Sequence, residues 1–236
     1  MSLETISLSH GGTEFEGLVA RPDGPGPHPA VMVMHSGLGL RHMVADKARA
    51  LADLGYLAVA PDMYGAGADT STPQKAGQFY MVYHDQPQLL RERCVAWFET
   101  VAALPGVDAA RIAAIGYCFG GRCALELARS GADIKAAVSY HGILTTHAPA
   151  APGAIRGAVS VWAGLADPFA PQADINALKA EMTAAGARWH VAEFAGVQHG
   201  FTDPAGEGGA AGIAYDPVAD RVSWMGTLGL LEAVLA

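Results

Sequence analysis

The sequence predicts an α/β fold with a mostly parallel central sheet flanked by helices on both faces. Three observations lead to this prediction. Continuous apolar runs of strand length recur along the chain, and such runs are typical of strands buried on both faces. Most intervals between these runs contain a segment of helical periodicity, as crossovers between parallel strands require. The chain has 236 residues, 51% of them hydrophobic, which is enough apolar material for one large core.

The expected strands begin with a hairpin, since Thr5–Leu8 and Phe15–Ala20 are short extended runs on either side of a His-Gly-Gly turn. After a proline-rich connector come the buried runs. These are Ala30–Met34, Leu57–Pro61, Ile112–Gly116, Ala136–Tyr140, Val159–Ala163 and Trp189–Phe194. In a parallel sheet, the ligand crevice lies beyond the carboxyl ends of such strands. We expect residues 1–236 to form a single domain.

Helices are expected at His42–Leu54, Gln88–Ala103, Phe119–Ser130, Pro171–Ala185 and Asp216–Leu235. Proline suits the first turn of the last two, where a missing N–H leaves no hydrogen bond unmade. Residues 64–89 are rich in Gly, Pro, Tyr and Gln, and are expected to form either a substrate-facing lid or a long loop pinned by aromatic side chains. The Gly/Ala-rich stretch Gly206–Gly212 indicates a surface loop. The amphipathic stretch Val218–Leu235 fits a core-facing helix or a dimer contact, so monomer and homodimer both stay open.

Composition excludes several function classes. The 15 Lys+Arg against 23 Asp+Glu give a net charge of −8, and no basic run occurs, so nucleic acid and anionic membranes are not expected partners. The chain shows no signal-peptide pattern and no apolar run of membrane-spanning length, and its three cysteines are too few for a disulfide framework; we expect a cytoplasmic protein. It also lacks metal-binding, dinucleotide and nucleoside-triphosphate motifs, so no metal or cofactor is expected.

The predicted strand Ile112–Gly116 runs into Gly-Tyr-Cys-Phe-Gly-Gly at residues 116–121, and a helical stretch follows at once. This is the strand-turn-helix pattern of a nucleophile elbow, G-x-S-x-G, with Cys118 in place of serine. Glycines two residues before and after the nucleophile leave room for the sharp turn. The helix N-terminus that follows favours a thiolate over a thiol. The alternative is that Cys118 is a small buried residue in a tight turn.

Elbow enzymes place an acid and a histidine later in the chain, in that order. Here Asp167 follows the predicted strand Val159–Ala163, and His199 follows Trp189–Phe194, so both lie on the same side of the sheet as Cys118. In the mechanism that this order suggests, His199 takes the proton of the thiol and Asp167 orients the imidazole. An aspartate before proline and a histidine before glycine are also common loop residues. The prediction therefore depends on the three residues together, on their order along the chain and on their placement after predicted strands.

The backbone N–H groups of Phe119 and Gly37 are the expected oxyanion donors, with Leu38 as the next choice for the second position. Six side chains are candidates to line the substrate pocket: His35, Ser36, Leu38, Tyr64, Tyr80 and Phe201. His35 and Ser36 fit a tight turn equally well. The hydroxyl of Tyr64 could equally bind a loop carbonyl.

With these motifs in place, the sequence resembles the dienelactone hydrolase family of the α/β-hydrolase superfamily. The resemblance covers nearly the whole chain, and its specific element is cysteine rather than serine in the elbow at residues 116–121. It implies a single-domain α/β-hydrolase fold with Cys118, Asp167 and His199 as the triad. It also implies Gly37 and Phe119 as the oxyanion donors.

Two departures from the family pattern bear on the substrate. The resemblance implies a glutamate where this chain has Ser36, and a carboxylate-binding arginine shortly after the histidine, where this chain has Asp203. Asp203 would repel a carboxylate. The favoured function is therefore hydrolysis of small neutral esters or lactones through a covalent thiol intermediate. Family members with promiscuous phosphotriesterase activity suggest neutral phosphotriesters as an alternative, and a non-catalytic ligand-binding module is a third hypothesis.

Overall fold

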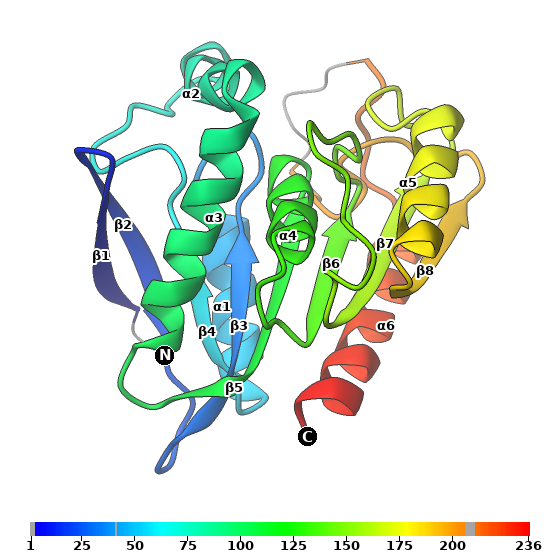
Figure 1. The fold of residues 1–236 in the computed structure, drawn as a ribbon. Coiled ribbons are helices and arrows are strands. Elements are labelled where there is room, and N and C mark those ends of the chain that lie inside the picture. Colours follow the sequence, from blue (N-terminus) through cyan, green and yellow to red (C-terminus); the bar gives the residue numbers. More distant parts are fainter. Residues whose placement is uncertain (1–2, 41, 206–210) are drawn as a thin grey trace.

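The strands of this computed structural model, which describes residues 3–40, 42–205 and 211–236, form one eight-stranded sheet. They are β1 (Glu4–His10), β2 (Thr13–Ala20), β3 (His28–Met34), β4 (Leu57–Ala60), β5 (Val107–Tyr117), β6 (Ala136–Tyr140), β7 (Ala158–Gly164) and β8 (Arg188–Phe194). Their order is β1-β2-β4-β3-β5-β6-β7-β8 (Figure 1). The pairs β1–β2 and β2–β4 are antiparallel, whereas every pair from β4 to β8 is parallel. The predicted α/β fold is confirmed.

Helices cover both faces of this sheet, and each face has its own apolar cluster. The helices are α1 (His42–Asp53), α2 (Pro73–Asp85), α3 (Pro87–Ala102), α4 (Phe119–Arg129), α5 (Gln172–Ala184) and α6 (Pro217–Leu235). α1 and α6 pack on one face through residues such as Leu51 and Leu231. α3, α4 and α5 pack on the other face, where Trp97 and Leu178 are buried (Figure 1). The two-sided burial explains why the parallel strands are apolar throughout.

Helix α2 is the main departure from the expected secondary structure, because the expected helices include none between residues 64 and 87. It begins at Pro73 and is capped by Thr72, whose Oγ1 accepts a hydrogen bond from the N–H of Lys75 at 3.3 Å. Threonine followed by proline is a favourable helix start, and this signal was present in the sequence. Gly77 and the polar and aromatic residues around it masked the helical periodicity. Of the two alternatives for residues 64–89, an uninterrupted long loop is contradicted by α2, whereas a lid stays a prediction. Helix α2 lies beyond the strand ends, at the top of Figure 1.

The C-terminal helix α6 faces the core along one stripe. Its buried residues recur every four positions: Ala219, Ser223, Thr227, Leu231 and Leu235. Val218, Val222 and Met225 are exposed on another side of the helix, and a contact of this side with a second copy stays a prediction. The expected loop Gly206–Gly212 falls mostly on residues 206–210, which lie outside the described residues. None of the helices within the described ranges is long and apolar enough to cross a bilayer.

A buried cluster of charges joins α3, α4 and α5 to the segment after β6. Glu126 is fully buried, and its carboxylate accepts hydrogen bonds from Arg91 at 2.6 and 2.9 Å and from Arg129 at 3.1 Å. Arg129 also pairs with Glu181 at 2.8 Å. Both arginines donate to residues 144–148, through carbonyl oxygens at 2.6 and 3.0 Å and a threonine hydroxyl at 3.3 Å. The cluster therefore fastens this segment to the elbow helix α4.

Replacing Glu126 by glutamine is expected to lower the free energy of unfolding by about 3 kcal/mol, because two arginines lose their shared counter-charge in the interior. Urea denaturation measures this loss. Asp46→Asn is the matched control, since Asp46 forms an exposed pair with Arg49 at 2.8 Å. Its loss is expected to stay below about 0.5 kcal/mol. Equal, small losses in the two variants would contradict a structural role for the cluster.

Candidate active site

Strand β5 turns sharply into helix α4 at Cys118, whose φ of 55° and ψ of −114° are strained for a residue with a Cβ atom. Glycines make the turn possible. A Cβ on Gly116 would lie 2.0 Å from the carbonyl oxygen of Gly120, and a Cβ on Gly120 would lie 2.2 Å from the carbonyl oxygen of Met34. The N–H of Cys118 donates to the carbonyl oxygen of Tyr140 at 3.0 Å. The turn thus presents a partly exposed thiol at the N-terminus of a helix.

His199 and Asp167 lie next to this thiol, beyond the carboxyl ends of β8 and β7. Nδ1 of His199 is 2.8 Å from Oδ2 of Asp167, and the His199 side chain is in hydrogen-bonding contact with Cys118. The other carboxylate oxygen of Asp167 accepts a hydrogen bond from the N–H of Phe169 at 2.8 Å. Both His199 and Asp167 are buried. The structure therefore brings together the three residues that the sequence predicts as nucleophile, base and acid.

The surroundings of His199 favour its charged form. Burial lowers the pKa of His199, but its hydrogen bonds to Asp167 and Cys118 and the negative charge of these two groups raise it to about 10. The imidazole is therefore positively charged near neutral pH, and a positive group beside a sulfur favours the thiolate. The ring of Phe169 stands edge-on to the His199 ring at 4.8 Å between centroids.

Two backbone N–H groups beside the thiol are suited to hold an oxyanion. Phe119 is the first residue of α4, so its N–H has no partner within the helix. The N–H of Gly37 also has no hydrogen-bond partner among the described residues, whereas that of Leu38 donates to Oγ of Ser36 at 3.2 Å. The hydroxyl of Tyr64 donates to the carbonyl oxygen of Gly37 at 2.8 Å and steadies this loop. This geometry favours Gly37 over Leu38 as the second donor.

A cavity of about 340 Å³ opens onto Cys118 and His199. This volume is within the range of small-molecule pockets, about 300–1,000 Å³. Of the six predicted pocket residues, Leu38 and Tyr80 lie in its wall. Sequence reasoning missed the other side chains and backbone segments of the wall: Pro73, Gly77, Ile143, Phe169 and Ile213. These residues come from four separate segments of the chain. The one local signal in the sequence was Pro73, since a proline after threonine indicates the start of a helix.

The other four predicted pocket residues, His35, Ser36, Tyr64 and Phe201, do not line this cavity. His35 is fully buried and closes a turn: its Nδ1 donates to the carbonyl oxygen of Ser36 at 2.7 Å, and its Nε2 accepts the N–H of Met63 at 3.0 Å. Burial lowers the pKa of His35, in keeping with this neutral form. Tyr64 binds a loop carbonyl, and Phe201 is fully buried. For His35 and Tyr64, the contacts match the structural alternative that the sequence left open.

The cavity wall contains no Asp, Glu, Lys or Arg among the described residues. Asp203, which we expected to repel a carboxylate there, lies on a different cavity together with Lys47 and Asp220. That expectation was wrong, because the chain turns back after His199, with the N–H of Asp203 bonded to the carbonyl oxygen of Gly200 at 3.0 Å. Apart from Cys118 and His199, the described wall residues carry no ionisable acid or base, except the phenol of Tyr80. In the described ranges, no group of three His, Cys, Asp or Glu is placed to hold a metal ion.

Comparison with known proteins identifies the family. A sequence profile of the dienelactone hydrolase family matches residues 15–235. The chain belongs to this family. The solved structure of m3DLH is 35% identical, with a TM-score of 0.91 over 100% of this chain and 99% of that one. That of P91, a dienelactone hydrolase-like promiscuous phosphotriesterase from metagenomic libraries, is 32% identical, with a TM-score of 0.88 over the same shares. A Synechocystis protein named "Putative carboxymethylenebutenolidase" is 27% identical over 214 residues, 83% of this chain and 85% of that protein.

This member of the dienelactone hydrolase family is accordingly a hydrolase.

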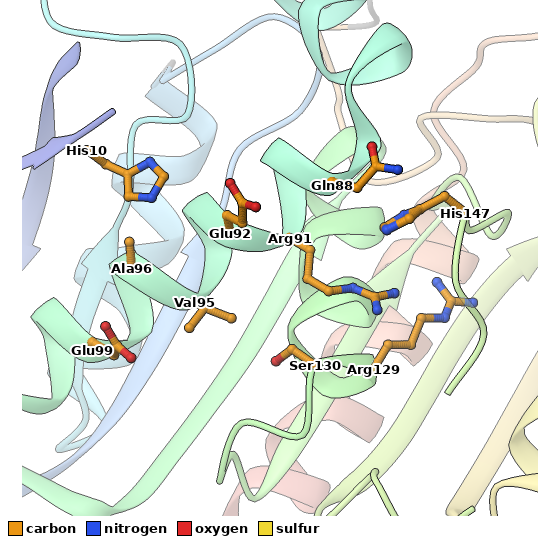
Figure 2. A pocket seen from close by; sticks show the side chains of 10 residues that line it. All are labelled: His10, Gln88, Arg91, Glu92, Val95, Ala96, Glu99, Arg129, Ser130 and His147. Atoms are coloured by element: carbon orange, nitrogen blue, oxygen red, sulfur yellow. The ribbon is translucent and has the colours of Figure 1, made fainter. Parts of the chain in front are cut away.

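A second, larger cavity of the protein lies away from the elbow. That cavity measures about 600 Å³ and is bordered by β1, α3, α4 and the segment after β6. Figure 2 shows Arg91, Arg129 and His147 gathered at one end and His10 and Glu99 at the other. The two arginines are already paired with Glu126. Neither Cys118 nor His199 lines this cavity, so it does not belong to the candidate active site.

Proposed function

We propose that the protein is a hydrolase of small neutral carboxylic esters or lactones in which Cys118, His199 and Asp167 form a catalytic triad. The observation that carries this proposal is the strained cysteine at the elbow, in contact with a His199–Asp167 pair and facing a cavity whose wall has no Asp, Glu, Lys or Arg among the described residues. A buried or inert cysteine needs none of these features. The family membership supports the reaction class, and the site geometry supports the roles of the residues.

In the proposed reaction, the thiolate of Cys118 attacks the carbonyl carbon and forms a tetrahedral intermediate. The N–H groups of Phe119 and Gly37 stabilise its oxyanion. The intermediate expels the alkoxide, which takes a proton from the His199 imidazolium and leaves as an alcohol. Neutral His199 then removes a proton from water, the hydroxide attacks the thioester carbonyl, and the carboxylic acid leaves as the thiolate and imidazolium form again. Asp167 stays ionised and holds Nδ1 of His199 throughout.

The charge of the substrate gives a direct test. The esterase activity toward 4-nitrophenyl butanoate is expected to exceed that toward 4-nitrophenyl hemisuccinate by at least about 10-fold in kcat/KM. A carboxylate loses water on entering this cavity, finds no Lys or Arg in the described wall, and meets a His199 already paired with Asp167 and Cys118. Methyl 4-nitrophenyl succinate, which has the same chain without the charge, is the control and is expected to match the butanoate. Faster hydrolysis of the hemisuccinate would reject the neutral-substrate proposal.

Hydrolysis of neutral phosphotriesters is a second candidate function, favoured by the similarity to the phosphotriesterase P91. The same thiolate would attack phosphorus and expel the alcohol, and water activated by His199 would release the phosphodiester. With diethyl 4-nitrophenyl phosphate we expect release of many equivalents of nitrophenolate per enzyme, lost in Cys118→Ala. Release of a single equivalent, followed by loss of esterase activity, would show that the thiol is phosphorylated but not regenerated, and would reject this function.

A further inference from the structure

His141 has an unusual backbone and a buried, incompletely bonded side chain. It directly follows β6, and its φ of 39° is positive. Among the described non-glycine residues, Cys118 is the only other one with a positive φ. Only 2% of the residue is exposed, and its Nδ1 has no hydrogen-bond partner in the described part of the chain. Strain of this kind costs about 1–3 kcal/mol and concentrates at functional sites. Neither the sequence motifs nor the proposed triad gives this residue a role.

The contacts of His141 lie on the segment that carries His199. Its Nε2 is 2.8 Å from Oγ1 of Thr202, three residues after His199 in the chain. Its ring stands edge-on to the ring of His199 at 5.0 Å between centroids, at 70° between planes. The ring of Phe169 also contacts the His199 ring, with 4.8 Å between the two centroids. His199 therefore has two aromatic neighbours, and one of them is itself fastened to the histidine-bearing segment.

The residue before His141 fastens the nucleophile. The carbonyl oxygen of Tyr140 accepts the N–H of Cys118 at 3.0 Å, while the N–H of His141 donates to the carbonyl oxygen of Trp162 on β7 at 2.9 Å. Two consecutive residues at the end of β6 thus hold the cysteine turn on one side and the His199 segment on the other. The left-handed backbone at His141 lets its side chain meet Thr202 while its N–H stays bonded to β7.

We propose that His141 is a positioning residue that, through its hydrogen bond to Thr202 and its ring contact with His199, sets the distance and orientation of His199 relative to Cys118. This inference rests on the proposed role of His199 as the base. Small displacements between reacting groups are costly, since about 1 Å can lower a rate by about 100-fold. The imidazole of His141 forms a hydrogen bond with Thr202 that an apolar side chain could not form, and this bond fixes the position of the segment that carries His199.

The charge state of His141 suits this role. Burial and the positive charge of His199 lower the pKa of His141 well below the usual histidine value, so His141 is neutral beside the charged imidazole. The groups in contact with His141 are the rings of Tyr117, His199 and Phe201 and the hydroxyl of Thr202. Among these, His199 alone carries charge near neutral pH. A neutral His141 therefore places no second positive charge beside the imidazolium of His199.

Two variants remove the hydrogen bond from opposite ends: His141→Phe keeps a ring against His199, and Thr202→Val keeps the shape of Thr202. Each is expected to lower kcat for a neutral nitrophenyl ester by about 10- to 100-fold, with a change in KM below about 3-fold. The double variant is expected to be no worse than His141→Phe, because both changes remove one interaction. The rate of thiol alkylation by iodoacetamide at about pH 6 is expected to fall as well, since a displaced imidazolium no longer stabilises the thiolate.

Thr227→Val is the matched control. Thr227 is buried and accepts hydrogen bonds from the hydroxyl of Tyr140 at 2.5 Å and from Nε1 of Trp162 at 3.1 Å. Tyr140 precedes His141, and Trp162 is the β7 residue that accepts its N–H. No hydrogen bond or ring contact joins Thr227 to His199 among the described residues. We expect this variant to lower the melting temperature and to leave kcat and the pH dependence of alkylation unchanged.

Two failures can be told apart. If His141→Phe and Thr202→Val lower the melting temperature but keep the wild-type kcat and pH profile, His141 is merely structural and the inference is wrong. If Cys118→Ala retains the activity of the wild type, the proposed function fails instead, whatever the His141 variants show. Loss of kcat in His141→Phe alone, with Thr202→Val unchanged, would also overturn the hydrogen-bonded positioning proposed here.

Discussion

Alanine in place of Cys118 is expected to lower kcat for neutral nitrophenyl esters by at least about 10⁴-fold, because the reaction loses its nucleophile while the oxyanion donors remain. The fold is expected to be unaffected. Cys118 is partly exposed, and alanine in the left-handed turn is no more strained than cysteine. Steady-state hydrolysis of 4-nitrophenyl butanoate, with the melting temperature measured in parallel, checks both expectations.

Cys123→Ala provides the control in the same helix. Cys123 is fully buried against Cys94 in the core between α3 and α4, and burial raises the pKa of its thiol well above the usual value, so it is an inert thiol. We expect this variant to lose some stability and to keep kcat within about 3-fold of the wild type. Equal loss of activity in the two alanine variants would mean that structural disturbance, rather than removal of the nucleophile, explains the Cys118 result.

Asparagine in place of Asp167 is expected to lower kcat by about 10³- to 10⁴-fold. The hydrogen bond and charge of Asp167 help to raise the pKa of His199 to about 10, so their removal lowers that pKa. At neutral pH, less of the enzyme then holds the imidazolium and thiolate pair. Alkylation of Cys118 by iodoacetamide at about pH 7 should therefore be slower in Asp167→Asn than in the wild type, because less imidazolium is present to stabilise the thiolate.

Asp203→Asn is the control, because it makes the same chemical change at a residue that lines a different cavity. Neither Cys118 nor His199 lines that cavity. Its kcat and alkylation profile are expected to match those of the wild type. A wild-type alkylation rate in Asp167→Asn would show that Asp167 does not sustain the charge on His199. In that case Asp167 could still order the loop, but its proposed electrostatic role would be wrong.

The parallel strands were predictable because burial on both faces leaves an unbroken apolar signature. Ala136–Tyr140 was placed without error, and Ala30–Met34 lacked just the two residues at the start of β3. The first half of β5 was missed for the opposite reason. Val107–Arg111 is partly exposed, and its two charged residues and two alanines give no strand signal that distinguishes it from a loop. Strand ends that leave the core carry little hydrophobic signal.

The elbow was predictable because its chemistry is local: two glycines, a cysteine, and a strand and helix in fixed order. The cavity wall was not, because Ile143, Phe169 and Ile213 lie in separate loops, and their meeting depends on how those loops pack. His141 was missed for a related reason. Its positive φ and its contact with His199 follow from the tertiary structure, and a histidine after a strand gives no sign of either.

The central claim is that hydrolysis proceeds through an acyl group on the sulfur of Cys118. Rapid mixing of the wild-type protein with 4-nitrophenyl butanoate, followed by acid quenching and peptide mass analysis, tests it most directly. The account predicts a burst of nitrophenolate equal to the enzyme concentration, and a mass increase of about 70 Da, one butanoyl group, on the peptide that contains Cys118. A slow release without a burst or adduct, or a butanoyl group on a different residue, would contradict it.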